Sequence, residues 1–273
     1  MFPSAADPKR RDVLKRAALA PLLPLASIAA PSLHAAGDPF EGDPYKSHPW
    51  PDMRREFLGA DARVVFDPRV QVRGPVTAEN PVVVPISVAV APGLGPVRRI
   101  VALVDRNPIR KVLDFEPKRG VKPAVAFRFK LEQASAVRAA VLADDGLWHV
   151  GGGWVDSAGG GCTVSGATRQ DGSWTRTLGQ VSGKLFADPE GGARLRVRVM
   201  HPMDTGLVAG IPAFYLNRLV VSTALGDELL RLATWEPVSE NPVFSFDLAQ
   251  RPSGPLRVSG SDNNGNRIET EIG

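Results

Sequence analysis

The sequence has one cysteine in 273 residues, Cys162. A lone thiol cannot close an internal disulfide, so no such cross-link stabilises the fold. Free cysteines are usually buried, but Gly159, Gly160 and Gly161 directly precede this one, and glycine gives the backbone wide conformational freedom. We therefore expect an exposed thiol on a flexible glycine arm. The alternative is a core cysteine beside a glycine-rich loop.

The sequence also lacks a long unbroken apolar run. Residues 17–36 come nearest to such a run, but this stretch is short and contains Pro21, Pro24 and Pro31. We therefore expect no membrane span. A twin arginine, Arg10–Arg11, precedes this stretch, which ends in small residues. The pattern is typical of a twin-arginine export signal. We predict that residues 1–36 are a signal peptide and that the protein is periplasmic.

Little net charge remains without that segment. Residues 1–36 hold five of the 33 basic and two of the 29 acidic residues, which leaves 28 and 27, a net charge of +1. The basic isoelectric point of the whole chain therefore does not indicate nucleic-acid binding. In an oxidising periplasm a lone thiol is open to oxidation and to mixed disulfides, and a disulfide-linked homodimer is one such product.

Helix patterns are scarce. One segment, 52–58, follows Pro51 and ends at Gly59, a typical helix start and stop. Its Met53, Phe57 and Leu58 should pack onto the first sandwich. Elsewhere apolar and polar residues alternate at the strand period. The predicted strands are 82–90, 100–104, 125–131, 137–141, 148–150, 194–199, 244–248, 256–258 and 268–272.

Short strands separated by turns predict an all-β fold of two β-sandwich domains. The alternation fails between residues 156 and 192, which are rich in glycine, serine and threonine. We interpret that stretch as a connection. The predicted organisation is a first sandwich with a short N-terminal helix over 37–158, a glycine-rich thiol arm and linker over 159–192, and a second sandwich over 193–273.

Other polar residues favour structural roles. His149 is the histidine nearest the thiol along the chain and could act as a base, but its strand position favours a structural histidine. His201 and Met203 suit copper, yet the ligand set is incomplete and Pro202 indicates a turn. We therefore predict no metal site and no bound cofactor. Basic side chains alternate along one strand, as expected for a solvated face, with an acidic partner or an anionic substrate as the alternative: Arg194, Arg196 and Arg198.

Several motifs resemble a known family. In the second half, His-Pro-Met-Asp-Thr-Gly at 201–206 is followed by Ile-Pro-Ala-Phe at 211–214 and Trp-Glu-Pro at 235–237. This series resembles the Z subunit of the SoxYZ sulfur carrier. In the first half, Val-Asp-Arg-Asn-Pro at 104–108 and Gly-Gly-Gly-Cys at 159–162 resemble the Y subunit. The whole mature chain is similar to a fused SoxYZ-like carrier of the kind associated with quinoprotein dehydrogenases.

The resemblance implies two immunoglobulin-like β-sandwiches that stay docked on each other, and a role without catalysis. Apolar residues around the 201–206 turn and the 211–214 segment are candidates for the contact between them. Cys162 would be the covalent carrier thiol for sulfur intermediates, on an arm of Gly159, Gly160 and Gly161. The implied partners are periplasmic sulfur-oxidation enzymes, or quinoprotein dehydrogenases and cytochromes. An accessory or assembly role in a quinoprotein dehydrogenase system, without sulfur carriage, is the alternative.

The chain departs from the family at the thiol. The family cysteine lies two residues from a free carboxyl end, whereas about 110 residues follow Cys162 here. The arm is therefore tethered at both ends, which lowers its reach. For an exposed thiol, Cys162→Ser should change stability by no more than about 0.5 kcal/mol.

Overall fold

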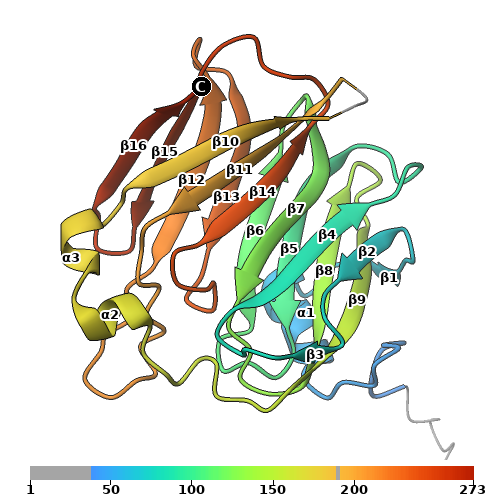
Figure 1. The fold of residues 1–273 in the computed structure, drawn as a ribbon. Coiled ribbons are helices and arrows are strands. Elements are labelled where there is room, and N and C mark those ends of the chain that lie inside the picture. The colour runs from blue at the N-terminus through green and yellow to red at the C-terminus, as the bar shows by residue number, and fades with distance from the viewer. Residues whose placement is uncertain (1–37, 189–190) are drawn as a thin grey trace, which may run out of the picture. The chain divides into compact units, whose positions relative to one another are not determined.

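The computed structural model describes residues 38–188 and 191–273, and the predicted signal peptide lies outside them. Residues Gly37–Gly273 form one compact unit. Its strands build two facing sheets (Figure 1). Within the described ranges, no helix is both long and apolar enough to cross a bilayer.

The first half of the chain contributes α1 (Trp50–Leu58), β1 (Val64–Phe66), β2 (Val70–Arg73), β3 (Thr77–Ala78), β4 (Val84–Val90), β5 (Val97–Val104), β6 (Lys111–Pro117), β7 (Val121–Phe129), β8 (Ser135–Ala143) and β9 (Trp148–Ser157). The second half contributes α2 (Ala167–Asp171), α3 (Trp174–Thr177), β10 (Val181–Ala187), β11 (Ala193–Val199), β12 (Leu216–Thr223), β13 (Glu228–Thr234), β14 (Val243–Leu248), β15 (Leu256–Asp262) and β16 (Arg267–Ile272).

Both halves contribute to both sheets. The ten-stranded sheet has the order β1-β9-β8-β5-β6-β13-β12-β15-β16, with β3 beside β9, and the six-stranded sheet has the order β10-β11-β14-β7-β4-β2. Each half is therefore an immunoglobulin-like sandwich of two facing layers. The predicted all-β fold is confirmed.

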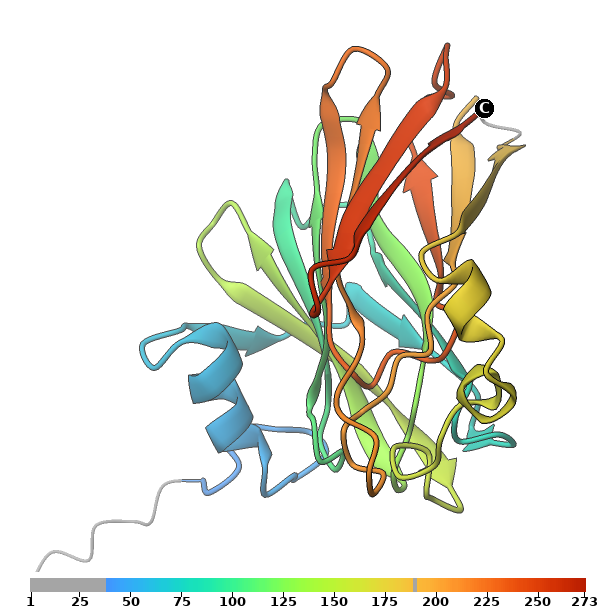
Figure 2. The same ribbon diagram turned by 90° about the vertical axis from the view of Figure 1, so that its left-hand side faces the viewer.

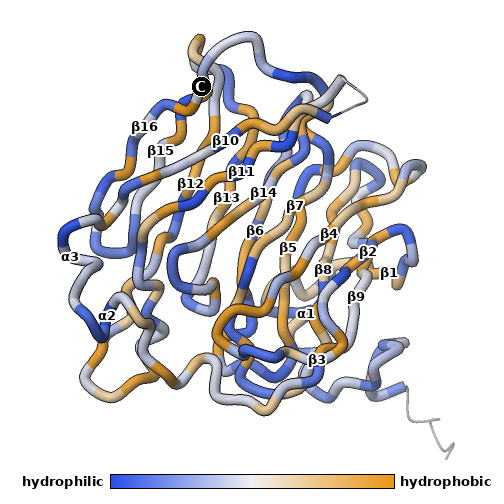
Figure 3. Tube along the Cα trace, viewed as in Figure 1, coloured by the Kyte–Doolittle hydropathy of each residue, from blue (hydrophilic) through white to orange (hydrophobic). Residues whose placement is uncertain are grey.

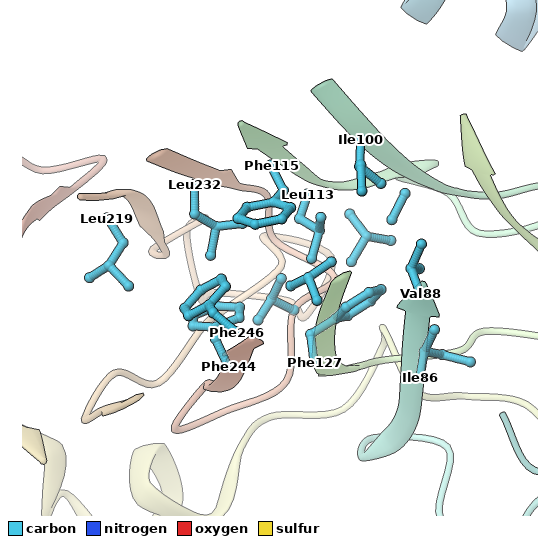
Figure 4. Close-up of a cluster of buried hydrophobic side chains, with 14 of the residues drawn as sticks. Ile86, Val88, Ile100, Leu113, Phe115, Phe127, Leu219, Leu232, Phe244 and Phe246 are labelled. Carbon is cyan, nitrogen blue, oxygen red and sulfur yellow. The ribbon is translucent and has the colours of Figure 1, made fainter. Parts of the chain in front are cut away.

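The two halves are joined by strand pairing. Antiparallel pairs β6–β13 and β7–β14 carry each sheet from the first half into the second. Side chains from both halves meet between the sheets in one hydrophobic core (Figure 4). Phe115 of the first half stacks on Phe246 of the second, with 5.4 Å between ring centroids. Separating the two halves from each other would therefore expose core side chains to water and would also break backbone hydrogen bonds.

Alternation in the sequence explains which faces are buried (Figure 3). Along β11, Leu195 and Val197 point into the core, while Arg194, Arg196 and Arg198 are exposed. A strand presents successive side chains to opposite faces, so this pattern places the arginines on the outside of the six-stranded sheet.

The predicted helix is confirmed as α1. Its Trp50 and Met53 are fully buried against residues of β5, β8 and β9, including Val101 and Trp148. Figure 2 shows α1 on one side of the strands and α2 and α3 on the other.

The prediction that 156–192 lacks strands is wrong in part. β9 continues to Ser157, and residues 181–187 form β10. β10 pairs with β11 at the margin of the six-stranded sheet, so most of its side chains are exposed, and Gly183 interrupts its apolar positions. Backbone pairing with β11 forms this strand where the side-chain pattern is weak.

Candidate functional site

Cys162 is buried, with 1% of its surface exposed, so the prediction of an exposed thiol is wrong for this structure. Its amide donates to Glu132 Oε2 at 2.8 Å, and its Sγ–H donates to the Lys130 carbonyl at 3.6 Å. Thr205 Oγ1 donates to the Cys162 carbonyl at 2.7 Å. Groups from both halves of the chain therefore hold this residue.

The glycines explain why the thiol is buried. The amide of Gly160 donates to the Glu132 carbonyl at 3.0 Å, and that of Gly161 donates to the Leu131 carbonyl at 3.2 Å. A Cβ on Gly161 would collide with the Pro81 carbonyl and would lie 2.6 Å from the Leu131 carbonyl oxygen. The missing side chains therefore allow close backbone packing, which brings Cys162 inward, and the predicted flexible arm of Gly159, Gly160 and Gly161 is not seen.

Two of these glycines also have backbone angles that disfavour other residues. Gly159 has φ 94° and Gly160 has φ 82°, in the region where a Cβ is strained. Residues 158–166, called the thiol loop from here on, thus take a defined path over residues 131 and 132.

The surroundings of the thiol keep it protonated. Burial, together with the nearby Glu132 carboxylate, raises the pKa of Cys162 to about 12, and the Lys130 ammonium acts in the opposite direction. Because the thiolate is the nucleophilic form, the thiol is unreactive at neutral pH in this arrangement.

Lys130 is the buried cation beside the thiol. Its Nζ donates to the Met203 carbonyl. Burial lowers the pKa of Lys130, and the nearby Cys162, Asp204 and Glu240 oppose that change. Lys130 therefore links the first half to the 201–206 turn and also places a positive charge near the thiol.

Asn107 braces the residues that contact the thiol. Its Nδ2 donates to the Lys130 carbonyl at 2.7 Å, and its Oδ1 accepts from the Glu132 amide at 2.8 Å. Asn107 belongs to the 104–108 motif, and Thr205 belongs to the 201–206 motif. Motifs far apart in the sequence thus meet at Cys162.

His201 has a structural role in the 201–206 turn. Its Nδ1 accepts from the Met203 amide at 3.1 Å, and Met203 has φ 52°. The other ring nitrogen therefore carries the proton, 3.6 Å from Asp262. Burial lowers the pKa of His201 to about 4, so the ring is neutral at pH 7. Among the described residues, no group of three or more histidine, cysteine, aspartate or glutamate side chains could hold a metal.

The chain beyond the thiol loop is fastened to the second half. Arg169 of α2 forms an ion pair with Asp204 and lies over the Trp174 ring, 4.2 Å from its centroid. The Thr168 amide donates to Glu240 Oε1 at 2.8 Å. The loop is thus anchored at β9 and again at α2.

The remaining candidates lie elsewhere in the fold. His149 is buried between Asp67 at 2.8 Å and Asp145 at 2.9 Å, and it makes no hydrogen bond to Cys162.

The sequence did not indicate that Lys130 and Glu132 are neighbours of the thiol. Lys130 occupies an outward position in the predicted alternation of 125–131, so nothing local indicated its burial.

Two family models match the chain in tandem. The model described as "Sulfur oxidation protein SoxY" matches residues 54–162, and "Sulphur oxidation protein SoxZ" matches residues 187–272. The first match ends at Cys162. Among proteins with curated functions, none matches the sequence.

A solved structure is also similar: the sulfur carrier protein SoxY from Chlorobium limicola f thiosulfatophilum. The identity is 21%, and the match covers 40% of this chain and 90% of that chain with a TM-score of 0.36.

Proposed function

We propose that this chain, which belongs to the SoxYZ family as a SoxY domain followed by a SoxZ domain, carries sulfur intermediates covalently on Cys162 for partner enzymes. One observation supports this proposal above the others. Asn107 and Glu132 from the SoxY region and Thr205 from the SoxZ region all converge on the backbone around this single thiol. The chain itself acts as a carrier and not as a catalyst.

The chemistry of loading requires partners. Joining the terminal sulfur of an intact thiosulfate ion to Cys162 replaces the thiol S–H bond by an S–S bond, which releases a proton and two electrons. With one cysteine, the chain cannot form an internal disulfide that could accept those electrons. A partner redox protein, such as a cytochrome, would take them, and a hydrolytic partner would later remove oxidised sulfur.

Loading also requires the thiol loop to open. The closed loop is held by hydrogen bonds from Gly160, Gly161, Cys162 and Thr163 to residues 131 and 132, and by the bond from Thr205. At the usual net value per bond, releasing them costs about 3–7 kcal/mol, typical of local opening. The closed state would protect the thiol between encounters.

The tether limits how far the opened thiol reaches. Cys162 lies five residues beyond Ser157, the last residue of β9, so an extended loop moves it at most roughly 17 Å from the end of that strand. On the C-terminal side of the loop, the ion pair between Arg169 and Asp204 also limits how far Cys162 can move. We therefore expect partner active sites that are shallow or that accept a loop, in contrast to a deep, narrow pocket suited to a free chain end.

We place the carrier in the periplasm. The twin arginine and the apolar stretch over residues 17–36 support export, and a sheltered thiol suits an oxidising compartment.

Intact mass spectrometry of protein purified from the periplasm, with and without reductant, tests the carrier function. We expect a wild-type mass increase that fits added sulfur and that reductant removes, and no increase in Cys162→Ser. Unmodified protein from cells that are actively oxidising thiosulfate would contradict sulfur carriage.

The burial of Cys162 favours a second candidate, an accessory or assembly role in a quinoprotein dehydrogenase system. A thiol with a pKa near 12 could simply fill the core. In that case Cys162→Ser would leave the linked oxidation pathway intact, whereas a carrier would lose its function entirely.

A further inference from the structure

The outer face of the six-stranded sheet carries an unusual arrangement of charge. Strand pairing aligns one residue from each of five neighbouring strands in a continuous row: Arg73, Ser87, Ala126, Ser245 and Arg196. Two arginines thus bracket three small side chains. Since neighbouring strands lie about 4.8 Å apart, the two arginine backbones are roughly 19 Å apart.

A second row adds further arginines. Arg128 on β7 is opposite Pro85, and Arg198 on β11 is opposite Val243. Together the rows border a hollow of about 470 Å³ whose lining includes Arg73, Arg128 and Arg196. Arg73, Arg128, Arg196 and Arg198 are called the basic face from here on.

The positive charges of this face are poorly compensated. Among the described residues, Arg196 and Arg198 form no ion pair, and Arg128 donates to the Asn241 carbonyl at 3.3 Å while its buried Nε has no acceptor. Burial and the two neighbouring arginines lower the pKa of Arg128. Asp247, on the same sheet, is already engaged by Arg194 at 2.7 Å. Grouped like charges raise the free energy of the face, and a bound anionic surface would lower it.

We infer that the basic face is a docking surface for an acidic segment of a partner protein. The distance between the arginine-bearing edges exceeds the size of a single oxyanion. The floor of serine and alanine leaves room between them for an extended strand or for a helix about 10 Å wide. Charge complementarity of this kind steers association and fixes register.

The basic face lies beside the thiol loop in the fold. Arg128 lies near the end of β7 and precedes Lys130 by two residues, and the Lys130 carbonyl accepts the Cys162 Sγ–H. The Asn241 carbonyl that accepts from Arg128 belongs to a residue whose amide donates to the His201 carbonyl. A docked partner would therefore lie next to the loop, whether or not Cys162 carries sulfur.

Titration of the full chain with an oligoglutamate peptide, followed by amide chemical shifts, tests this surface. Wild-type shifts should concentrate on β7, β11 and β14 and should weaken as salt is added. The double variant Arg196→Glu/Arg198→Glu should lose at least about tenfold in affinity, as expected when close charge pairs are reversed. The matched control is Arg218→Glu/Arg267→Glu, which makes the same charge change at exposed residues of the ten-stranded sheet. The affinity of this control variant for the peptide should stay within about twofold of the wild-type affinity.

Three results would overturn the inference: equal affinity losses in both double variants, shifts spread over both sheets, or saturation of the same amides by sulfate alone. The first two would indicate a nonspecific charge effect, and the third would indicate a small-anion site. A circular-dichroism melt of each variant checks that it is folded. Because the peptide experiment does not involve the thiol, its failure leaves the carrier proposal unaffected.

Discussion

At the scale of single residues, the burial of Cys162 sets the cost of replacing it. The serine hydroxyl in Cys162→Ser can still donate to the Lys130 carbonyl, but it is smaller and more polar than the thiol in a fully packed site. We expect the free energy of unfolding to fall by about 1–2 kcal/mol, which is more than the 0.5 kcal/mol expected for an exposed position.

Urea denaturation measures this difference. The matched control is Val164→Ser, two residues away, where the side chain is 47% exposed. Its free energy of unfolding should lie within about 0.5 kcal/mol of the wild-type value. Equal and negligible losses in both variants would show that the thiol is exposed in solution.

The pH dependence of alkylation provides a second test at the same scale. The pKa of Cys162 is about 12 in the closed loop and should be about 8.5 once the loop opens. A raised pKa stabilises the closed loop fully below pH 8.5, and that stabilisation is lost progressively as the pH rises from 8.5 toward 12.

Iodoacetamide should therefore react with wild-type Cys162 at a rate that continues to rise about tenfold per pH unit above pH 8.5, because ionisation also draws the loop open. A free cysteine peptide should level off near pH 8.5. A wild-type profile that levels off with the peptide would contradict the buried thiol.

At the scale of the element, the thiol loop depends on close backbone contact at Gly161. Its φ does not require glycine, but an added Cβ would collide with the carbonyl of Pro81. Gly161→Ala should therefore push the loop away from residues 131 and 132, and alkylation of Cys162 at pH 8 should be at least about tenfold faster.

Gly254→Ala is the control, since a Cβ there meets nothing within 4 Å and its φ is not positive. It should leave the alkylation rate unchanged. Global stability should fall only slightly in Gly161→Ala, because a surface loop can move without disturbing the core. A core-wide loss of stability with no faster labelling would show that the loop does not open separately.

At the scale of the whole molecule, the two halves are joined by backbone pairing as well as by the connection between them. Cutting the chain between β9 and β10 leaves the β6–β13 and β7–β14 pairs and the shared core intact. A protease site inserted at Gly172, where the surroundings are open, should therefore yield two fragments that stay associated.

Size-exclusion chromatography and a thermal melt of the cut protein test this expectation. The fragments should elute together and melt in one transition, as expected when they share a core. Two fragments that separate as soluble, folded domains would contradict the shared core, and the uncut insertion variant controls for the insertion itself.

The sequence alone determined the class of fold and most of its strands. Alternation along segments such as 194–199 is a local property, because successive strand residues point to opposite faces. The helix predicted over residues 52–58 followed equally from local features, Pro51 before it and Gly59 after its end, and in the structure it begins two residues earlier, at Trp50. The motifs at 104–108, 159–162 and 201–206 likewise indicated the family from residue identity alone.

Only the tertiary structure decided the state of the thiol. The residues that bury Cys162 lie 30 positions before it, at Glu132, and 43 after it, at Thr205, and no local pattern indicates which distant segments will meet. The glycines before Cys162 are compatible with either an exposed or a buried thiol, because the missing side chain that permits a flexible arm also permits the closest backbone packing. The joining of the two halves was decided in the same way, by the distant strand edges that pair, β6 with β13 and β7 with β14.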